Sequence, residues 1–417
     1  MVLRAQLPAQ VLTVADVLKT AAADPRIGQN QSLLTLAQGL KMTDPLLRQI
    51  AVRIGTNGSA LGDTIYGYLR NEDTYNLIVG FNSLRERKRQ QQIKTARVES
   101  YIAETRLLEQ QALVERYQAL AGYLFAEPGL AACRKLDTLL EKEHEILRQM
   151  LSTAVLDVKV SKVLDAEEDR NRNLLALREL ENAQQLQKNR LRQFMGDFSD
   201  LDKTGVANLA DLKAAVALLK TTPATHPVFE VKNAETRLEA ANLEYITSQN
   251  RQIFNNFNAG YQRPLYLERP KRFNTFNNIS FRVGLTVPLP GNNRFKKAGA
   301  LLELREAQND ADWAHLQVEK SLENQFVRLE NLFREHALAQ DRLDRSLIRR
   351  MLDNPQLRAQ ITPLEIVELE IAQQKLVIAQ AGLEADIAVE FVRLLELSGA
   401  MSAVPRINYL SGKREGY

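Results

Sequence analysis

Four charged residues near two predicted helix starts are the part of this sequence best suited to binding ions. Glu365 and Glu368 lie three residues apart, which places both carboxylates on one face of a helix. Carboxylates grouped in this way attract cations. Acids in the first turn of a helix also interact favourably with its macrodipole, and this second interpretation stays open. Lys162 and Asp165 have the same spacing in the first half of the chain, so the two halves differ in charge.

No pattern in the chain indicates catalysis. The four histidines are scattered, so we expect no histidine-built metal site. The glycines of residues 55–62 lack the Lys-Ser/Thr ending of a phosphate-binding loop. No nucleophile has a partner base at a fitting position, and the single cysteine, Cys133, permits no internal disulfide. We therefore expect no enzyme activity, no cofactor and no metal.

Composition narrows the class of protein. The 417 residues are 45% hydrophobic and 25% charged, which excludes a disordered chain, a collagen and a disulfide scaffold. The net charge of +4 is evenly spread, so no nucleic-acid partner is expected. No apolar run approaches the roughly 20 residues of a membrane-spanning helix. Residues 1–10 show no signal peptide, and we expect that one was removed before this numbering begins.

Landmarks that recur after about 200 residues indicate a tandem duplication. Pro25 and Pro227 open similar segments, and long helical stretches end at Gly196 and Gly399. Residues 1–200 form the first predicted repeat and residues 226–400 the second. The predicted joint is 201–225, with a short helix at 209–220, and the predicted C-terminal tail is 401–417.

Residues 278–289 show the clearest strand pattern. Side chains alternate between the two faces of a strand, and one face here is wholly apolar: Ile279, Phe281, Val283, Leu285 and Val287. Weaker strands are predicted at about 47–57, 74–83 and 253–261. An ordinary half-buried antiparallel sheet would alternate in the same way. The segment lengths and the polar opposite faces also suit strands that cross a bilayer with these five residues facing lipid.

Four strands per chain are too few to close a barrel, and lipid does not tolerate an open sheet edge. If the strands span a membrane, several chains must therefore share one barrel.

The predicted helices are too long for a compact domain. They cover about 84–151 and 164–194 in the first half, and about 295–351 and 363–397 in the second. The first contains Glu127-Pro128-Gly129, where proline should break the helix. The last carries two adjacent apolar seams, interrupted at Gln374 on one and at Gln373, Gln380 and Glu390 on the other. Two seams predict neighbours on both sides, in a helical barrel or in a large globular bundle.

In this combination the sequence resembles the TolC-like outer-membrane efflux protein family over essentially its whole length. Residues 12–18 through Asp24-Pro25 look like the opening helix of that family. Residues 283–291 are similar to the end of its last strand, except that Pro290 stands where the family usually has an aromatic residue. Residues 394–399 fit its closing segment.

The resemblance implies a mainly α protein with membrane β structure. A long antiparallel α-helical barrel would be joined to four strands per chain in a shared trimeric β-barrel. The chain would be a passive channel subunit of a tripartite efflux or type I secretion system in the outer membrane of a Gram-negative bacterium, extending into the periplasm. Expected partners are two further copies, a periplasmic adaptor (membrane fusion) protein, an inner-membrane transporter and outer-membrane lipid.

The resemblance also places the turns at 152–161 and 353–362 at the periplasmic tip. Glu365, Glu368, Lys162 and Asp165 would then lie at its aperture, where threefold symmetry turns each residue into a ring. The alternative function is a soluble coiled-coil scaffold that binds partners and conducts nothing.

Overall fold

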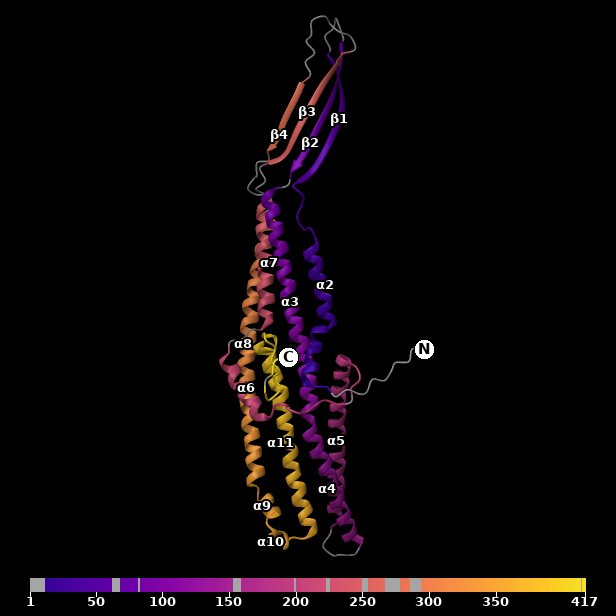
Figure 1. Ribbon diagram of the computed structural model, residues 1–417, viewed down its shortest axis with the longest axis vertical. Helices are drawn as coiled ribbons and strands as arrows, with labels where there is room; N and C mark the ends of the chain where they lie inside the picture. The colour runs from indigo at the N-terminus through magenta and orange to yellow at the C-terminus, as the bar shows by residue number, and fades with distance from the viewer. Residues whose placement is uncertain are drawn as a thin grey trace, which may run out of the picture. The chain divides into compact units, whose positions relative to one another are not determined.

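The computed structural model describes residues 12–61, 68–81, 83–152, 159–198, 200–222, 226–249, 254–266, 278–285, 294–413 and 415–417. Within these residues the chain forms long helices and one four-stranded antiparallel sheet (Figure 1). The first half contains α1 (Val14–Lys19), η1 (Thr20–Ala23), α2 (Pro25–Gly39), β1 (Leu47–Leu61), β2 (Tyr68–Phe81), α3 (Leu84–Leu124), α4 (Ala126–Ser152) and α5 (Val160–Met195).

The second half repeats the order of helix, two strands and long helices. It contains α7 (Pro227–Gln249), β3 (Phe254–Tyr266), β4 (Asn278–Leu285), α8 (Arg294–Arg345), α9 (Leu347–Asp353), α10 (Pro355–Arg358), α11 (Pro363–Ser398) and η2 (Ala400–Ser402), and α6 (Leu209–Thr221) lies in the joint between the halves. Residues 286–289 of the last predicted strand lie outside the described residues.

Spatial contacts divide the chain into two units that differ from the predicted repeats. The helical unit comprises Met1–Gln29, Thr105–Phe229 and Ala314–Tyr417. The sheet unit comprises Asn30–Glu104 and Glu230–Trp313. Each unit therefore takes residues from both halves, and the repeat bounds stay a prediction.

The long helices break where the sequence weakens the backbone hydrogen-bond ladder. Pro128 has no N–H to donate to the carbonyl of Leu124, so α3 ends at Leu124. The break thus lies at Phe125, just before Glu127-Pro128-Gly129, where the sequence predicts it. Pro128 itself occupies the first turn of α4. The second break follows from Ser346, whose hydroxyl accepts the N–H of Arg349 at 3.1 Å and caps α9.

Helix α11 contacts helices on both sides, which confirms the expectation from its two apolar seams. Towards α4, the Gln374 side chain donates to the carbonyl of Ala132 at 3.0 Å. Towards α8, Gln325 donates to the carbonyl and the carboxylate of Glu390, both at 2.8 Å. Helix α4 also packs against α5. The order within the helical unit is α8, α11, α4 and α5 (Figure 1).

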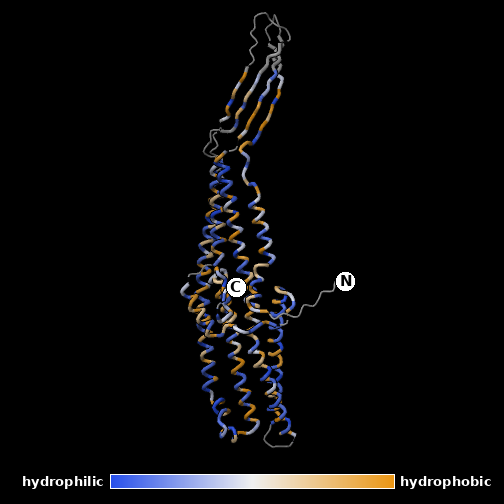
Figure 2. Tube along the Cα trace, in the orientation of Figure 1, coloured by the Kyte–Doolittle hydropathy of each residue, from blue (hydrophilic) through white to orange (hydrophobic). Residues whose placement is uncertain are grey.

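The hydrophobic core of the helical unit gathers around the end of α3 and the end of α11, where Tyr117 and Phe391 are fully buried. Segment 401–417, predicted as a tail, packs into this core. The Tyr117 hydroxyl donates to the carbonyl of Ile407 at 3.1 Å and accepts the N–H of Tyr409 at 3.2 Å. Apolar residues also run along α11 and along the strands (Figure 2). No described helix is long and apolar enough to cross a membrane.

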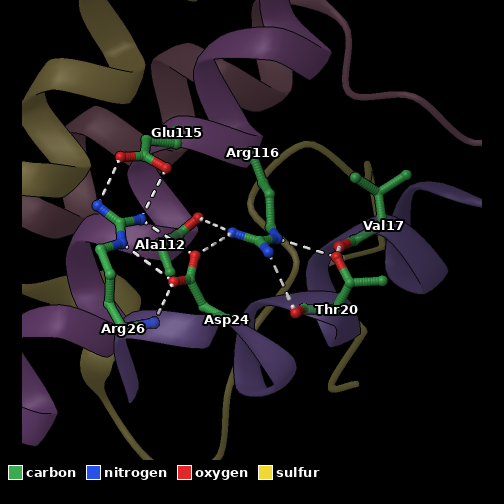
Figure 3. A network of polar contacts seen from close by, with 7 residues as sticks. All are labelled: Val17, Thr20, Asp24, Arg26, Ala112, Glu115 and Arg116. Atoms are coloured by element: carbon green, nitrogen blue, oxygen red, sulfur yellow. Dashed lines mark hydrogen bonds and ion pairs between the residues drawn. The ribbon is translucent and has the colours of Figure 1, made fainter. Parts of the chain in front are cut away.

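An ionic network centred on the buried Asp24 and Arg116 fastens the N-terminal segment to α3 (Figure 3). Arg116 is only 3% exposed, donates to the hydroxyl of Thr20 at 2.9 Å and lies 3.5 Å from the carboxylate of Asp24. Arg26 donates to Asp24 at 3.0 Å and binds both carboxylate oxygens of Glu115 at 2.9 and 2.8 Å. Because each buried charge has a partner, the network holds the start of α2 in one position.

We expect Asp24→Asn to lower the free energy of unfolding by about 3 kcal/mol at neutral pH, because it leaves Arg116 buried with a weaker partner. Hydrogen bonds from Arg26 lower the pKa of Asp24 to about 2, whereas the unfolded value is near 4. The ionised carboxylate therefore stabilises the fold above about pH 4, and this contribution is lost as the pH falls towards 2.

Chemical denaturation in detergent at several pH values measures the effect. The difference between the parent and Asp24→Asn should narrow from pH 4 to pH 2. The exposed Asp312→Asn serves as the control and should change little. A difference that is constant over this pH range would contradict the assigned role of Asp24.

Candidate functional site

The strand register places the apolar positions of all four strands on one face of the sheet. Directly opposed residues in an antiparallel sheet point to the same side. Three consecutive rows are apolar across the sheet: Ile54, Tyr75, Tyr261, Ile279; then Val52, Leu77, Ala259, Phe281; then Ile50, Val79, Phe257, Val283. At its two edges this face is open, with Ile54 at 70% and Phe281 at 69% exposure in the single chain. An apolar patch of this extent marks a binding or membrane surface.

Three of the five residues predicted to face lipid lie on this apolar face, namely Ile279, Phe281 and Val283. Leu285 ends β4, and its side chain is outside the described set. Val287 lies outside the described residues.

The apolar residues that β3 adds to this face were not predicted from the sequence. Phe257, Ala259 and Tyr261 occupy the apolar rows, while Asn256 and Asn258 point to the other side. The alternation is present in the sequence, but the asparagines make the segment look irregular.

On the polar face, side chains of β2 and β4 occupy the space above Gly260. A Cβ atom on Gly260 would lie 2.6 Å from the Oδ1 atom of Asn76 and 2.6 Å from the Oγ atom of Ser280. An alanine at this position would therefore require the side chains of Asn76 and Ser280 to shift.

The second candidate site is a cluster of charges on α4, α5 and α11 in the helical unit. The Lys162 ammonium lies 2.7 Å from the carboxylate of Glu368, and Lys375 lies 2.7 Å from Asp169. Each pair joins α5 to α11. Two of the four residues predicted for the aperture are therefore direct partners, although they stand about 200 residues apart in the chain.

Glu143 on α4 belongs to the same cluster. Burial raises its pKa, and the neighbouring carboxylates of Glu368 and Asp169 raise it further, whereas Lys162 and Lys375 act in the opposite direction. The sequence offers no local signal for Glu143, Asp169 or Lys375, because their helices meet only in the folded chain.

Glu365 has a structural role at the start of α11. Its carboxylate accepts the N–H of Thr362 at 2.9 Å and the Thr362 hydroxyl at 2.8 Å, which completes a capping box. Hydrogen bonds from Thr362 lower the pKa of Glu365. Asp165 is exposed on α5. Glu365 thus stabilises the start of α11, as acids in the first turn of a helix can. Glu368 instead forms an ion pair with Lys162.

A cavity of about 480 Å³ lies beside these two carboxylates. Its lining comes from α9, α10, the turn after α10 and the start of α11: Met351, Leu357, Gln360, Ile361, Glu365, Glu368 and Leu369. Among the described residues, no three histidine, cysteine or acidic side chains are grouped so that they could hold a metal ion.

No family model matches the chain, and no curated protein matches its sequence. Solved structures do match its fold. A membrane protein from Pseudomonas aeruginosa aligns with a TM-score of 0.64 and 13% identity, over 95% of this chain and 98% of its own. The structure of CusC aligns with a TM-score of 0.62 and 11% identity over 95% of both chains. The outer membrane protein VceC from Vibrio cholerae aligns with a TM-score of 0.60 and 13% identity, over 93% of this chain and 96% of its own.

The chain has the TolC-like fold. The alignments extend over nearly the whole chain, so they include both the sheet unit and the helical unit. This confirms the fold class expected from the sequence. In this TolC-like chain, the two candidate sites are the two-faced sheet and the charge cluster of α4, α5 and α11.

We expect the Lys162–Glu368 pair to contribute a modest stability. The two side chains are 51% and 36% exposed, and pairs of this kind contribute about 0.2–1 kcal/mol. A double-mutant cycle with Lys162→Met and Glu368→Gln should show a coupling in this range at low salt. The coupling should weaken in about 1 M salt, where the Debye length is about 3 Å.

The matched control cycle combines Lys162→Met with Glu370→Gln, whose partner in the structure is Arg358. It should show no coupling. Equal coupling in the two cycles would mean that the measured energy does not come from the Lys162–Glu368 contact.

Proposed function

We propose that the protein is the outer-membrane channel subunit of a tripartite efflux or type I secretion system, acting as a passive conduit. The observation that carries this proposal is the continuous apolar face across β1, β2, β3 and β4, opposite a polar face. A strand pair at the surface of a soluble protein has no need of such a face, whereas a strand between lipid and water requires it. The likeness to structures described as outer membrane channels, OprN and CmeC among them, supports the same function.

The sheet also supports a shared barrel. Strands β1 and β4 are the two edges of the sheet. In a bilayer, unpaired backbone groups on an edge strand cost several kcal/mol each because no water is available to them. Pairing β4 of one copy with β1 of the next removes every edge once the ring closes. Three copies then provide twelve strands, an even number within the range of such barrels.

Matching apolar stripes on the two outer helices of the helical unit support the same closed ring. On α5, Leu164, Leu175 and Leu186 are exposed at intervals of 11 residues. On α8, Leu316, Val327 and Leu338 are exposed at the same interval. Eleven residues are close to three helical turns, so each set lies along one face. Because α5 and α8 are the opposite ends of the order α8, α11, α4 and α5, the stripes fit a head-to-tail contact between copies.

The proposed partners and the proposed aperture follow from the role of a passive channel. A passive channel in the outer membrane of a Gram-negative bacterium needs an energy source elsewhere, which an inner-membrane transporter and a periplasmic adaptor protein supply. Glu365, Glu368, Lys162 and Asp165 remain our candidates for the periplasmic aperture. Since Lys162 offsets Glu368, the acidic character there rests on Glu365 and Asp165.

We expect Phe281→Arg to impair assembly far more than Ser280→Arg. The two residues are neighbours on β4 but point to opposite faces. An arginine on the lipid face near the middle of the bilayer costs about 2–4 kcal/mol, while a wet interior imposes no such cost. The measurement is the amount of trimer recovered from outer membranes of a Gram-negative host.

Equal recovery of the two variants would contradict a lipid-facing apolar surface. A stable monomer of the parent protein in buffer without detergent would favour the scaffold alternative and end the channel proposal.

We expect Leu175→Glu on α5 and Val327→Glu on α8 each to weaken the trimer, because both place a charge within an apolar contact between copies. The loss of one buried leucine or valine alone costs about 1.5–3 kcal/mol. Size measurement in detergent across a dilution series reports the shift to monomer. Ala176→Glu is the matched control, because Ala176 is exposed on α5 beside the stripe, and it should leave the trimer intact. Equal dissociation in all three variants would show that the stripes are not the contact.

A further inference from the structure

The polar face of the sheet carries charges of only one sign where the apolar face is continuous. The side chains of this face, row by row, are Gln49, Gly80, Asn256, Gly284; then Ala51, Ile78, Asn258, Arg282; then Arg53, Asn76, Gly260, Ser280. The charged members of this set are Arg53 on β1 and Arg282 on β4. Both side chains are exposed.

The residues around the two arginines do not neutralise them. In the pairing register Arg53 stands opposite Asn76, and Arg282 stands opposite Asn258. Amides hydrogen-bond without carrying charge. Among the side chains that the structure describes, no carboxylate forms an ion pair with Arg53 or Arg282. A guanidinium also stays protonated over the whole physiological pH range.

The arginines lie in adjacent rows but on opposite edges of the sheet. In the ring proposed above, β4 of one copy neighbours β1 of the next. The two arginine-bearing strands then stand side by side at each of three joints. Six guanidinium groups would then face the water-filled interior of the barrel.

We propose that Arg53 and Arg282 make this interior select anions over cations. The inference rests on the proposed function, because the interior exists only if the copies close into a channel. Rings of arginine or lysine favour anions in pores. The planar guanidinium also binds carboxylates and phosphates through two parallel hydrogen bonds. The chemical class of solute that this segment favours is therefore one bearing carboxylate or phosphate groups.

The test is the reversal potential of purified trimers in a planar bilayer under a KCl gradient near 0.1 M. The double variant Arg53→Gln/Arg282→Gln should lower the ratio of chloride to potassium permeability by at least about two-fold. Arg53→Lys/Arg282→Lys keeps the charge and should retain the parent ratio. The difference between the Gln and Lys variants should shrink near 1 M salt, because the Debye length falls from about 10 Å to about 3 Å.

A Glu365→Gln background separates this effect from the acidic residues of the helical unit. Replacing the arginines should lower the permeability ratio by the same factor with and without Glu365→Gln. If the double Gln variant does not form trimers, the single variants Arg53→Gln and Arg282→Gln are measured, and each should move the ratio in the same direction.

Two negative results have different meanings. If Gln-variant trimers conduct with an unchanged permeability ratio, the assigned role of Arg53 and Arg282 is wrong while the channel stands. If the parent trimer forms no conducting pore at all, the proposed function itself fails.

Discussion

The open edges of β1 and β4 are the physical constraint on which the assembly of this protein depends. A four-stranded antiparallel sheet with one apolar face has unpaired backbone groups on both outer strands and nothing in the described chain that covers the face. Either feature alone could be accommodated by a soluble protein, through a short charged edge or a covering helix. Both features are satisfied in the proposed ring, where identical sheets pair edge to edge within lipid.

The helical unit meets a related requirement with side chains. Helix α11 is apolar on two seams because it has a neighbour on each side. Three of the polar residues that interrupt these seams, Gln374, Gln380 and Glu390, have partners on those neighbours. Gln374 bonds to α4, while Glu390 is buried and bonds to Gln325 and Arg328 of α8. An unpaired polar group in these positions would cost free energy. The polar residues therefore fix the axial register and the rotation of α11 relative to each neighbouring helix.

Where α5 meets α11, charged side chains are paired across the two helices. Lys162 and Lys375 each neutralise an acid on the facing helix, and they lie near Glu143, which is partly removed from water. The pairs are exposed enough to break at small energetic cost, so they orient the helices without locking them. By contrast, the buried pair of Asp24 and Arg116 is costly to disturb, and it fastens the N-terminal segment to α3.

The sequence by itself determined the kinds of elements and much of their extent. The period of two in residues 278–289 and the apolar seams of residues 363–397 are local properties, so strand and helix follow from the nearest neighbours in the chain. The sequence located the helix break less well. Glu127-Pro128-Gly129 predicts it, but the helix is interrupted at Phe125, because the carbonyl that loses its hydrogen-bond donor lies four residues before the proline.

Only the tertiary structure decided what those elements bring together. The alignment of the apolar rows depends on the pairing register of four strands, and a shift by one residue would send each side chain to the other face. The pairing of Lys162 with Glu368, and the contacts of Ile407 and Tyr409 with Tyr117, join segments that are far apart in the chain. Such contacts follow from the packing of whole helices, which no local pattern encodes.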